Sequence, residues 1–97
     1  MAKQIIWSNL SEIDFDNILE YLFRNWDNKV TEQFMDLTEK TLLQIAESPK
    51  QFPLINKKFK IRKCVLTKHN IKYYRESKTQ IEILRIYDTG RILTVCF

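Results

Sequence analysis

The 97-residue chain is 44% hydrophobic and carries a net charge of +4, a composition that supports one packed core and excludes disorder. A single glycine, Gly90, excludes the glycine-rich loops of Walker-type and Rossmann-type nucleotide sites. No apolar run approaches the ~18 residues that span a membrane, and no signal-peptide pattern opens the sequence, so we expect a single cytoplasmic domain over residues 1–97.

The first half of the sequence predicts a short strand followed by two helices. Residues 3–7, KQIIW, are β-branched and aromatic, and they stop before Ser8, a good helix N-cap. Apolar residues then recur every three or four positions to about Arg24, and again from Val30 to the residue before Pro49. Because only a short polar turn separates the two stripes, we expect an antiparallel helical hairpin.

After a loop at residues 47–58, the apolar pattern changes to a period of two. Residues 60–66, 71–76 and 80–87 predict three strands joined by short turns, which form a β-meander. The third of these strands is largely apolar on both faces, which indicates a central strand covered by the helices. The predicted fold class is therefore α+β, in the order β-α-α-β-β-β. The helical hairpin packs on one face of a small antiparallel sheet and leaves the other partly open.

Charge is distributed unevenly along the chain. Residues 1–56 hold five lysines and arginines against nine acidic residues, whereas residues 57–97 hold eleven against three. A basic half of this kind indicates a partner that carries phosphates or many carboxylates. A solvated basic face without a role explains the same bias equally well.

Five segments, taken in order, carry a resemblance to a known family. They are WSxxSxxDFxxILxYL at 7–22, the SP pair at 48–49, IRKCVL at 61–66, IKYYR at 71–75 and ILRIYDTGR at 83–91. Together they resemble the RelE/ParE superfamily of toxins from type II toxin-antitoxin systems, and within it the ParE-like plasmid stabilisation proteins. The resemblance implies a RelE/ParE-like toxin domain that inhibits growth and is neutralised by a cognate antitoxin.

The superfamily has two functional branches. In ribosome-dependent RNases, cations on the sheet stabilise the scissile phosphate, and a Tyr or His near the C-terminus assists proton transfer. Arg62 and Arg91 match that pattern, but Cys64, Ile71 and Phe97 stand where basic residues or a tyrosine are expected. The ParE branch inhibits DNA gyrase without a known catalytic set, so the resemblance favours a ParE-like gyrase inhibitor over an mRNA endoribonuclease.

The candidate site residues come from the basic half. If the chain is a nuclease, the catalytic candidates are Arg62, Arg85, Arg91 and Tyr87, with His69 as an alternative proton carrier. The candidates for binding nucleic acid or the target are Lys57, Lys58, Lys60, Arg62, Lys63, Arg75, Arg85 and Arg91. For the cations of residues 57–63, protection of an edge strand against aggregation by charge is as good an explanation as binding. Glu82 or Glu76 is the expected partner if Arg85 is held in an ion pair. Tyr73, Tyr74 and Tyr87 are expected in the core more than on a base-stacking surface.

No cofactor or metal site is expected, because Cys64 and Cys96 lie far apart in the sequence and His69 is the single histidine. The expected partners are the antitoxin and either DNA gyrase or the ribosome with its mRNA, without a membrane. A homodimer and a toxin-antitoxin hetero-oligomer both stay open, as does a repurposed member that binds only nucleic acid or a regulator. The apolar end, ILTVCF, fits a fifth strand, a dimer contact or a truncation.

Overall fold

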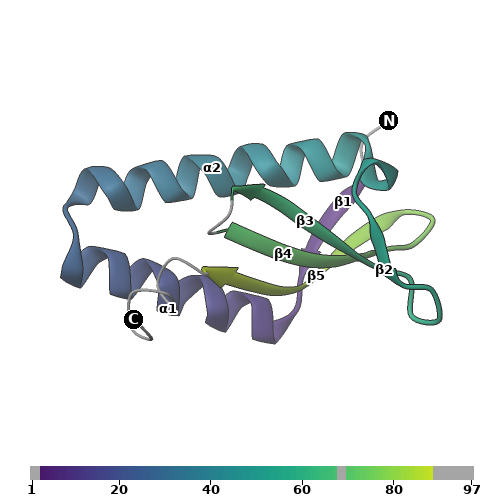
Figure 1. Ribbon diagram of the computed structural model, residues 1–97, viewed down its shortest axis with the longest axis horizontal. Helices are drawn as coiled ribbons and strands as arrows, with labels where there is room; N and C mark the ends of the chain where they lie inside the picture. Colours follow the sequence, from purple (N-terminus) through teal and green to yellow (C-terminus); the bar gives the residue numbers. More distant parts are fainter. Residues whose placement is uncertain (1–2, 68–69, 89–97) are drawn as a thin grey trace.

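The computed structural model describes residues 3–67 and 70–88. Figure 1 shows its elements, which in chain order are β1 (Gln4–Trp7), α1 (Asn9–Asn25), α2 (Asn28–Glu47), the 3-10 helix η1 (Pro49–Gln51), β2 (Leu54–Asn56), β3 (Ile61–Thr67), β4 (Asn70–Glu76) and β5 (Gln80–Asp88). The predicted α+β class and the helical hairpin are confirmed, and each predicted strand is present within one or two residues of its predicted bounds. None of the described helices combines the length and the apolar character needed to cross a membrane.

Side-chain caps fix where both helices begin. The Ser8 hydroxyl oxygen accepts the backbone N–H of Ser11 at 3.0 Å and so caps α1. The same hydroxyl donates to the carbonyl of Leu84 in β5 at 2.9 Å, which joins the start of the helix to the sheet. Asp27 caps α2 by accepting the N–H of Val30, and within residues 3–67 and 70–88 its side chain makes no such link to a strand.

The sheet has the strand order β1-β5-β4-β3-β2. Strands β2 to β5 pair antiparallel, but β1 lies parallel to β5, with Gln4 opposite Gln80 and Trp7 opposite Ile83. The sheet is therefore mixed, whereas we expected an antiparallel one. Alternation of apolar residues sets which side chains share a face, but it carries no information about the direction of the neighbouring strand.

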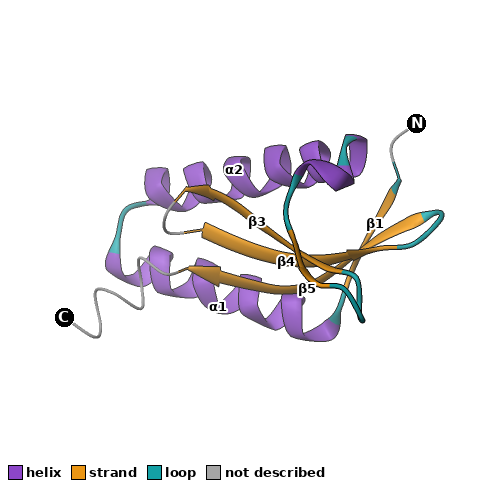
Figure 2. Ribbon diagram, turned by 45° about the vertical axis from the view of Figure 1, so that its right-hand side comes forward, coloured by secondary structure: helices purple, strands orange, loops and turns teal. Residues whose placement is uncertain are grey.

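The core lies between the two helices and one face of the sheet. Figure 2 shows α1 running alongside β5, the strand with which it makes its main contact. The buried apolar residues are Ile18 and Leu22 from α1, Phe34 and Ile45 from α2, and Cys64, Tyr74, Ile81, Ile83 and Ile86 from the sheet. Stacked rings of Phe15 and Phe34, 5.7 Å between centroids, join the helices to each other. The predicted helical stripes and the interior position of β5 are both confirmed.

A three-residue strand, β2, lies in the segment that was expected to be a loop. It follows Pro53 and pairs with the start of β3 in an irregular register. A strand of three residues is too short to show an alternating pattern in the sequence. Strand β2 forms the sheet edge and β3 lies inside the sheet. The suggestion that the cations before and within β3 protect an edge strand is therefore wrong for β3 itself.

A bulge in β5 decides which of its side chains face the helices. Tyr74 pairs with Ile83 and Tyr73 with Arg85, so Leu84 is an extra residue in the ladder. After this extra residue, Ile86 again faces the core, while Arg85 and Tyr87 face the opposite side. The extra residue is the one whose carbonyl accepts the Ser8 hydroxyl.

We predict that Ser8→Ala lowers the free energy of unfolding by about 1–2 kcal/mol, because it removes both the cap and the hydroxyl contact with β5. Asp27→Ala is the matched control, since it removes a cap without a link to a strand, and its cost is expected to be about 1 kcal/mol. Urea unfolding of the purified chain followed by circular dichroism measures both. An equal or smaller loss for Ser8→Ala would show that the link from Ser8 to the sheet contributes nothing.

Candidate functional sites

Strand pairing separates the nuclease candidates onto two sides of the sheet. Arg62 pairs with Tyr74, which is fully buried under the helices, so Arg62 points to the helix side. Arg85 pairs with Tyr73 and lies with Tyr87 on the opposite side. These three candidates do not converge on one concave surface. The two others, Arg91 and His69, lie outside the described residues.

The side of the sheet turned away from the helices, here called the open face, carries Lys63, Tyr73, Arg75, Glu82, Arg85 and Tyr87. The guanidinium carbon of Arg85 lies 5.1 Å from the ring centre of Tyr87, a cation–π contact. The Tyr87 ring meets Tyr73 edge to face, with centroids 5.7 Å apart. Of the three tyrosines expected in the core, only Tyr74 is a core residue, and the other two are half-buried on the open face.

Arg85 is held by Asp14 of α1. The two carboxylate oxygens accept the Arg85 Nε at 2.7 Å and a terminal nitrogen at 3.0 Å, and this hydrogen bonding raises the pKa of Arg85 above its ordinary value. Oδ2 of Asp14 also accepts the backbone N–H of Ile86 at 3.1 Å. Glu82 and Glu76 were the expected partners of Arg85. Instead, Glu82 pairs with Arg75 and Glu76 pairs with Lys3.

Helical periodicity alone would place Asp14 on the solvated side of α1, whereas its carboxylate lies against β5. Strand β1 ends at Trp7, so among the described residues no strand pairs with the N–H groups of β5 beyond Ile83 on that edge. Helix α1 runs along this edge and presents Asp14 to it, which satisfies the N–H of Ile86. Helical periodicity reports apolar positions and gives no signal for a carboxylate that closes a sheet edge.

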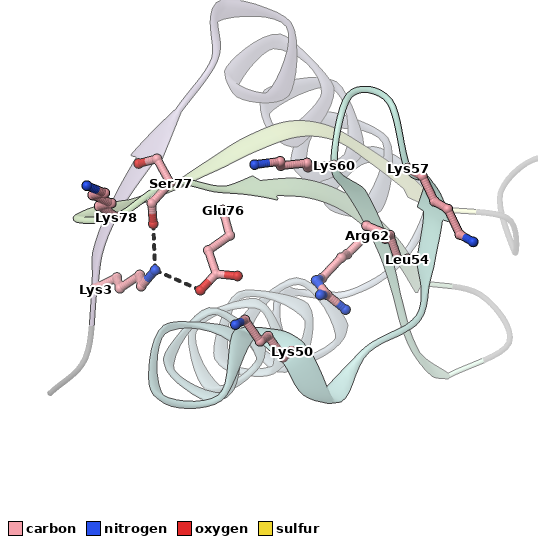
Figure 3. Close-up of a pocket in the computed structure, with 9 residues that line it drawn as sticks. All are labelled: Lys3, Lys50, Leu54, Lys57, Lys60, Arg62, Glu76, Ser77 and Lys78. Atoms are coloured by element: carbon pink, nitrogen blue, oxygen red, sulfur yellow. Dashed lines mark hydrogen bonds and ion pairs between the residues drawn. The ribbon is translucent and has the colours of Figure 1, made fainter.

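A cationic hollow of about 580 Å³ lies at the end of the sheet where the β2–β3 and β4–β5 turns meet (Figure 3). Its lining residues are Lys3, Lys50, Leu54, Lys57, Lys60, Arg62, Glu76, Ser77 and Lys78. Three of its cations, Lys57, Lys60 and Arg62, were predicted as binding residues. The other three lysines come from the residue before β1, from η1 and from the β4–β5 turn, and two of these lie in the acidic half of the sequence, where charge counting gave no signal.

Fixed contacts hold the walls of the hollow. The ammonium of Lys3 lies 2.7 Å from the Glu76 carboxylate and 2.5 Å from the carbonyl of Ser77. One terminal nitrogen of Arg62 donates to the carbonyl of Phe52 at 2.7 Å. Lys60 closes the β2–β3 turn with φ 57°, in the left-handed region that few residues other than glycine adopt.

The remaining binding candidates lie elsewhere. Lys58 rests 5.4 Å from the ring centre of Phe59 and does not line the hollow. Lys63 and Arg75 are on the open face, where Arg75 forms a 2.6 Å ion pair with Glu82. The basic half of the sequence thus supplies two separate surfaces, the open face and the cationic hollow, rather than one.

A buried lysine, Lys72, lies in the sheet opposite Cys64, and each is 1% exposed. Burial lowers the pKa of Lys72 to about 8 and raises the pKa of the Cys64 thiol to about 11, while the Coulomb interaction between the two groups opposes both shifts. Both side chains face the helices, so Cys64 does not lie on the open face. Burial of Lys72 could not be predicted from the sequence, because lysine on a strand normally faces water.

Within the part of the chain that the structure describes, no cluster of three histidine, cysteine or acidic side chains is arranged to hold a metal. The arrangement offers charge and aromatic surface for binding, from the open face and from the hollow.

Solved structures with a similar fold cover nearly the whole of this chain. The chain is similar to the structure of the chromosomal ParDE toxin-antitoxin system from P. aeruginosa, with a TM-score of 0.63 and 21% identity over 90% of this chain and 96% of that one. A conserved hypothetical protein of Helicobacter pylori, HP0894, gives a TM-score of 0.58 and 20% identity over 93% and 97%. A copper-bound mutant toxin from Helicobacter pylori gives 0.57 and 22% over 95% and 99%.

The fold is thus that of the RelE/ParE toxins. The family model described as "ParE toxin of type II toxin-antitoxin system, parDE" matches residues 5–93. The chain belongs to this ParE toxin family, as its sequence resemblance indicated. No curated protein sequence matches the chain.

We predict that the buried ammonium of Lys72 makes the stability of this toxin rise with pH. Between pH 8 and the ordinary lysine pKa of 10.5, the unfolded chain holds a proton that the folded chain has released. From pH 7.5 to 9, the free energy of unfolding should therefore increase by about 1 kcal/mol relative to Lys72→Met, which lacks the titrating group. The measured range stops at pH 9, because above pH 9 the raised pKa of Cys64 makes the free energy of unfolding fall as the pH rises. Parallel pH profiles for the two proteins would contradict the prediction.

Proposed function

We propose that the chain is a ParE-type toxin that inhibits DNA gyrase through its open face and is held inactive by a cognate antitoxin. The observation that most supports a binding role over catalysis is the separation of Arg62 from Arg85 and Tyr87 by the sheet. A phosphoryl-transfer site needs its cations around one phosphate, within a few ångströms of the reacting atoms. Side chains on opposite faces of a sheet do not meet that condition.

The contacts of the individual side chains support the same proposal. Arg85 is bonded through two nitrogens to Asp14, and Arg62 is bonded to a backbone carbonyl. Each of these guanidinium groups therefore has a fixed structural contact. Lys63 and Arg75 lie beside the tyrosine pair, and aromatic and cationic side chains together are frequent at protein interfaces.

An antitoxin is expected to cover the helices. Several large apolar side chains on α1, α2 and the turn between them are about half exposed or more: Leu10, Ile13, Phe23, Trp26, Met35 and Leu43. A small protein that exposes this much apolar surface commonly uses it to bind a partner. An amphipathic segment laid along the helical hairpin would bury these side chains.

Expression of the chain alone in bacteria is expected to arrest growth, and the purified chain is expected to block supercoiling of relaxed plasmid by gyrase. Coexpression of the antitoxin should relieve the arrest.

Primer extension on translated messages tests the alternative, an mRNA endoribonuclease, which Arg85 beside Tyr87 favours. New cut ends with unimpaired gyrase would overturn the proposal. No arrest at ample expression, together with steeply salt-dependent binding of nucleic acid, would indicate a repurposed member.

The role of the open face has its own test. Lys63→Glu combined with Arg75→Glu should abolish growth arrest and gyrase inhibition, because it reverses two charges on this face. Lys29→Glu with Lys40→Glu changes the same number of charges at exposed positions on α2 and should leave gyrase inhibition intact. Circular dichroism confirms that both double variants fold. Full inhibition by the open-face variant would exclude this face as the gyrase contact.

A further inference from the structure

From its charge and shape, we infer that the cationic hollow is a binding site for a phosphate-bearing ligand, separate from the open face. Six cations and one carboxylate, Glu76, line its volume of about 580 Å³. That volume is within the roughly 300–1,000 Å³ typical of small-molecule sites. Phosphates from a nucleotide and from a nucleic-acid backbone share the chemistry that this hollow recognises.

The positive charge of the hollow is largely uncompensated by its own walls. Glu76 is the single carboxylate among the lining residues, and it is already engaged by Lys3. Figure 3 shows the side chains of Lys50, Lys60 and Arg62 reaching toward the hollow from η1, from the β2–β3 turn and from β3. Like charges brought together by three different elements raise the local positive potential, and a bound polyanion relieves their repulsion.

Arg62 gives the hollow a fixed point for binding. Its bond to the carbonyl of Phe52 uses one terminal nitrogen, and a guanidinium has five N–H donors in all. Because the side chain is half-buried and already oriented, little conformational entropy remains to be lost when a phosphate oxygen binds. The surrounding lysines act as point charges, which suits phosphate contacts that do not depend on base identity.

The lining favours phosphate over an acidic peptide. Leu54 is the one apolar residue of the nine that line the hollow. Peptides gain their affinity mainly from buried aromatic and aliphatic anchors, and these need apolar pockets. A phosphate ligand needs only concentrated charge and N–H donors, and the hollow offers both.

Fluorescence competition and titration calorimetry on the purified full chain test the inference with four probes at matched ionic strength: inorganic triphosphate, ATP, a single-stranded oligonucleotide and a hexaglutamate peptide. Triphosphate and at least one of ATP and the oligonucleotide should bind, and the peptide should bind more weakly. Preference for ATP identifies a free nucleotide as the ligand, and preference for the oligonucleotide identifies a nucleic-acid backbone. Both results support the inference.

Variants then locate the site. Lys50→Gln and Lys60→Gln should each weaken triphosphate binding by roughly fivefold, the effect of one unit charge at about 4 Å in water, and should reduce its salt dependence. Lys40→Gln, an exposed lysine of α2 outside the lining, is the matched control and should change binding less than twofold. Glu76→Gln should tighten binding several-fold, because it removes the one negative charge and releases Lys3. If the role of Glu76 were purely structural, its replacement would not tighten triphosphate binding.

Three outcomes would overturn the inference. They are no measurable binding of triphosphate by the folded chain, equal loss in the Lys40→Gln control, and a hexaglutamate affinity that equals or exceeds that of triphosphate. The open-face variants keep the hollow intact, so loss of gyrase inhibition leaves these measurements unaffected. The hollow and the proposed gyrase contact therefore fail or succeed independently.

Discussion

The attachment of α1 to β5 is the interaction on which the rest of the structure depends. The hydroxyl of Ser8 binds the bulge in β5, and the carboxylate of Asp14 closes the strand edge beyond the end of β1. Together they satisfy backbone groups that would otherwise lie without partners beside the core. They also fix the helix against Ile83 and Ile86, so the same contacts determine the position of the core.

The bulge at Leu84 and the short strand β2 create the two surfaces. Without an extra residue in β5, strand alternation would turn Arg85 and Tyr87 toward the helices, and the open face would lose its cation–π pair. Without β2, the chain after η1 would not turn back to bring Lys57 and Lys60 beside Lys50. Irregular features thus shape both candidate binding surfaces, while the regular helices and strands form the support beneath them.

The sequence predicted the regular part well because burial follows periodicity. The helical stripes ending near Leu22 and Ile45, and the interior strand around Ile83, matched the buried residues. Periodicity could not predict the direction of β1, the bulge in β5 or the contact of Asp14 with β5. Each of these depends on which strand, distant in the sequence, lies alongside. The hollow was only half predicted for the same reason: Lys3 reaches it through a contact with a residue 73 positions away.

Because β1 pairs with β5, the sheet is complete only after the first and last described strands have paired. Contacts so distant in sequence form slowly and late, and a growing chain on the ribosome makes its N-terminal segments first. A nascent chain released before β5 has neither the partner of β1 nor the strand that carries Arg85 and Tyr87. Such fragments lack both the completed core and much of the open face. Any function that needs the open face therefore requires that β5 has been made and has paired with β1.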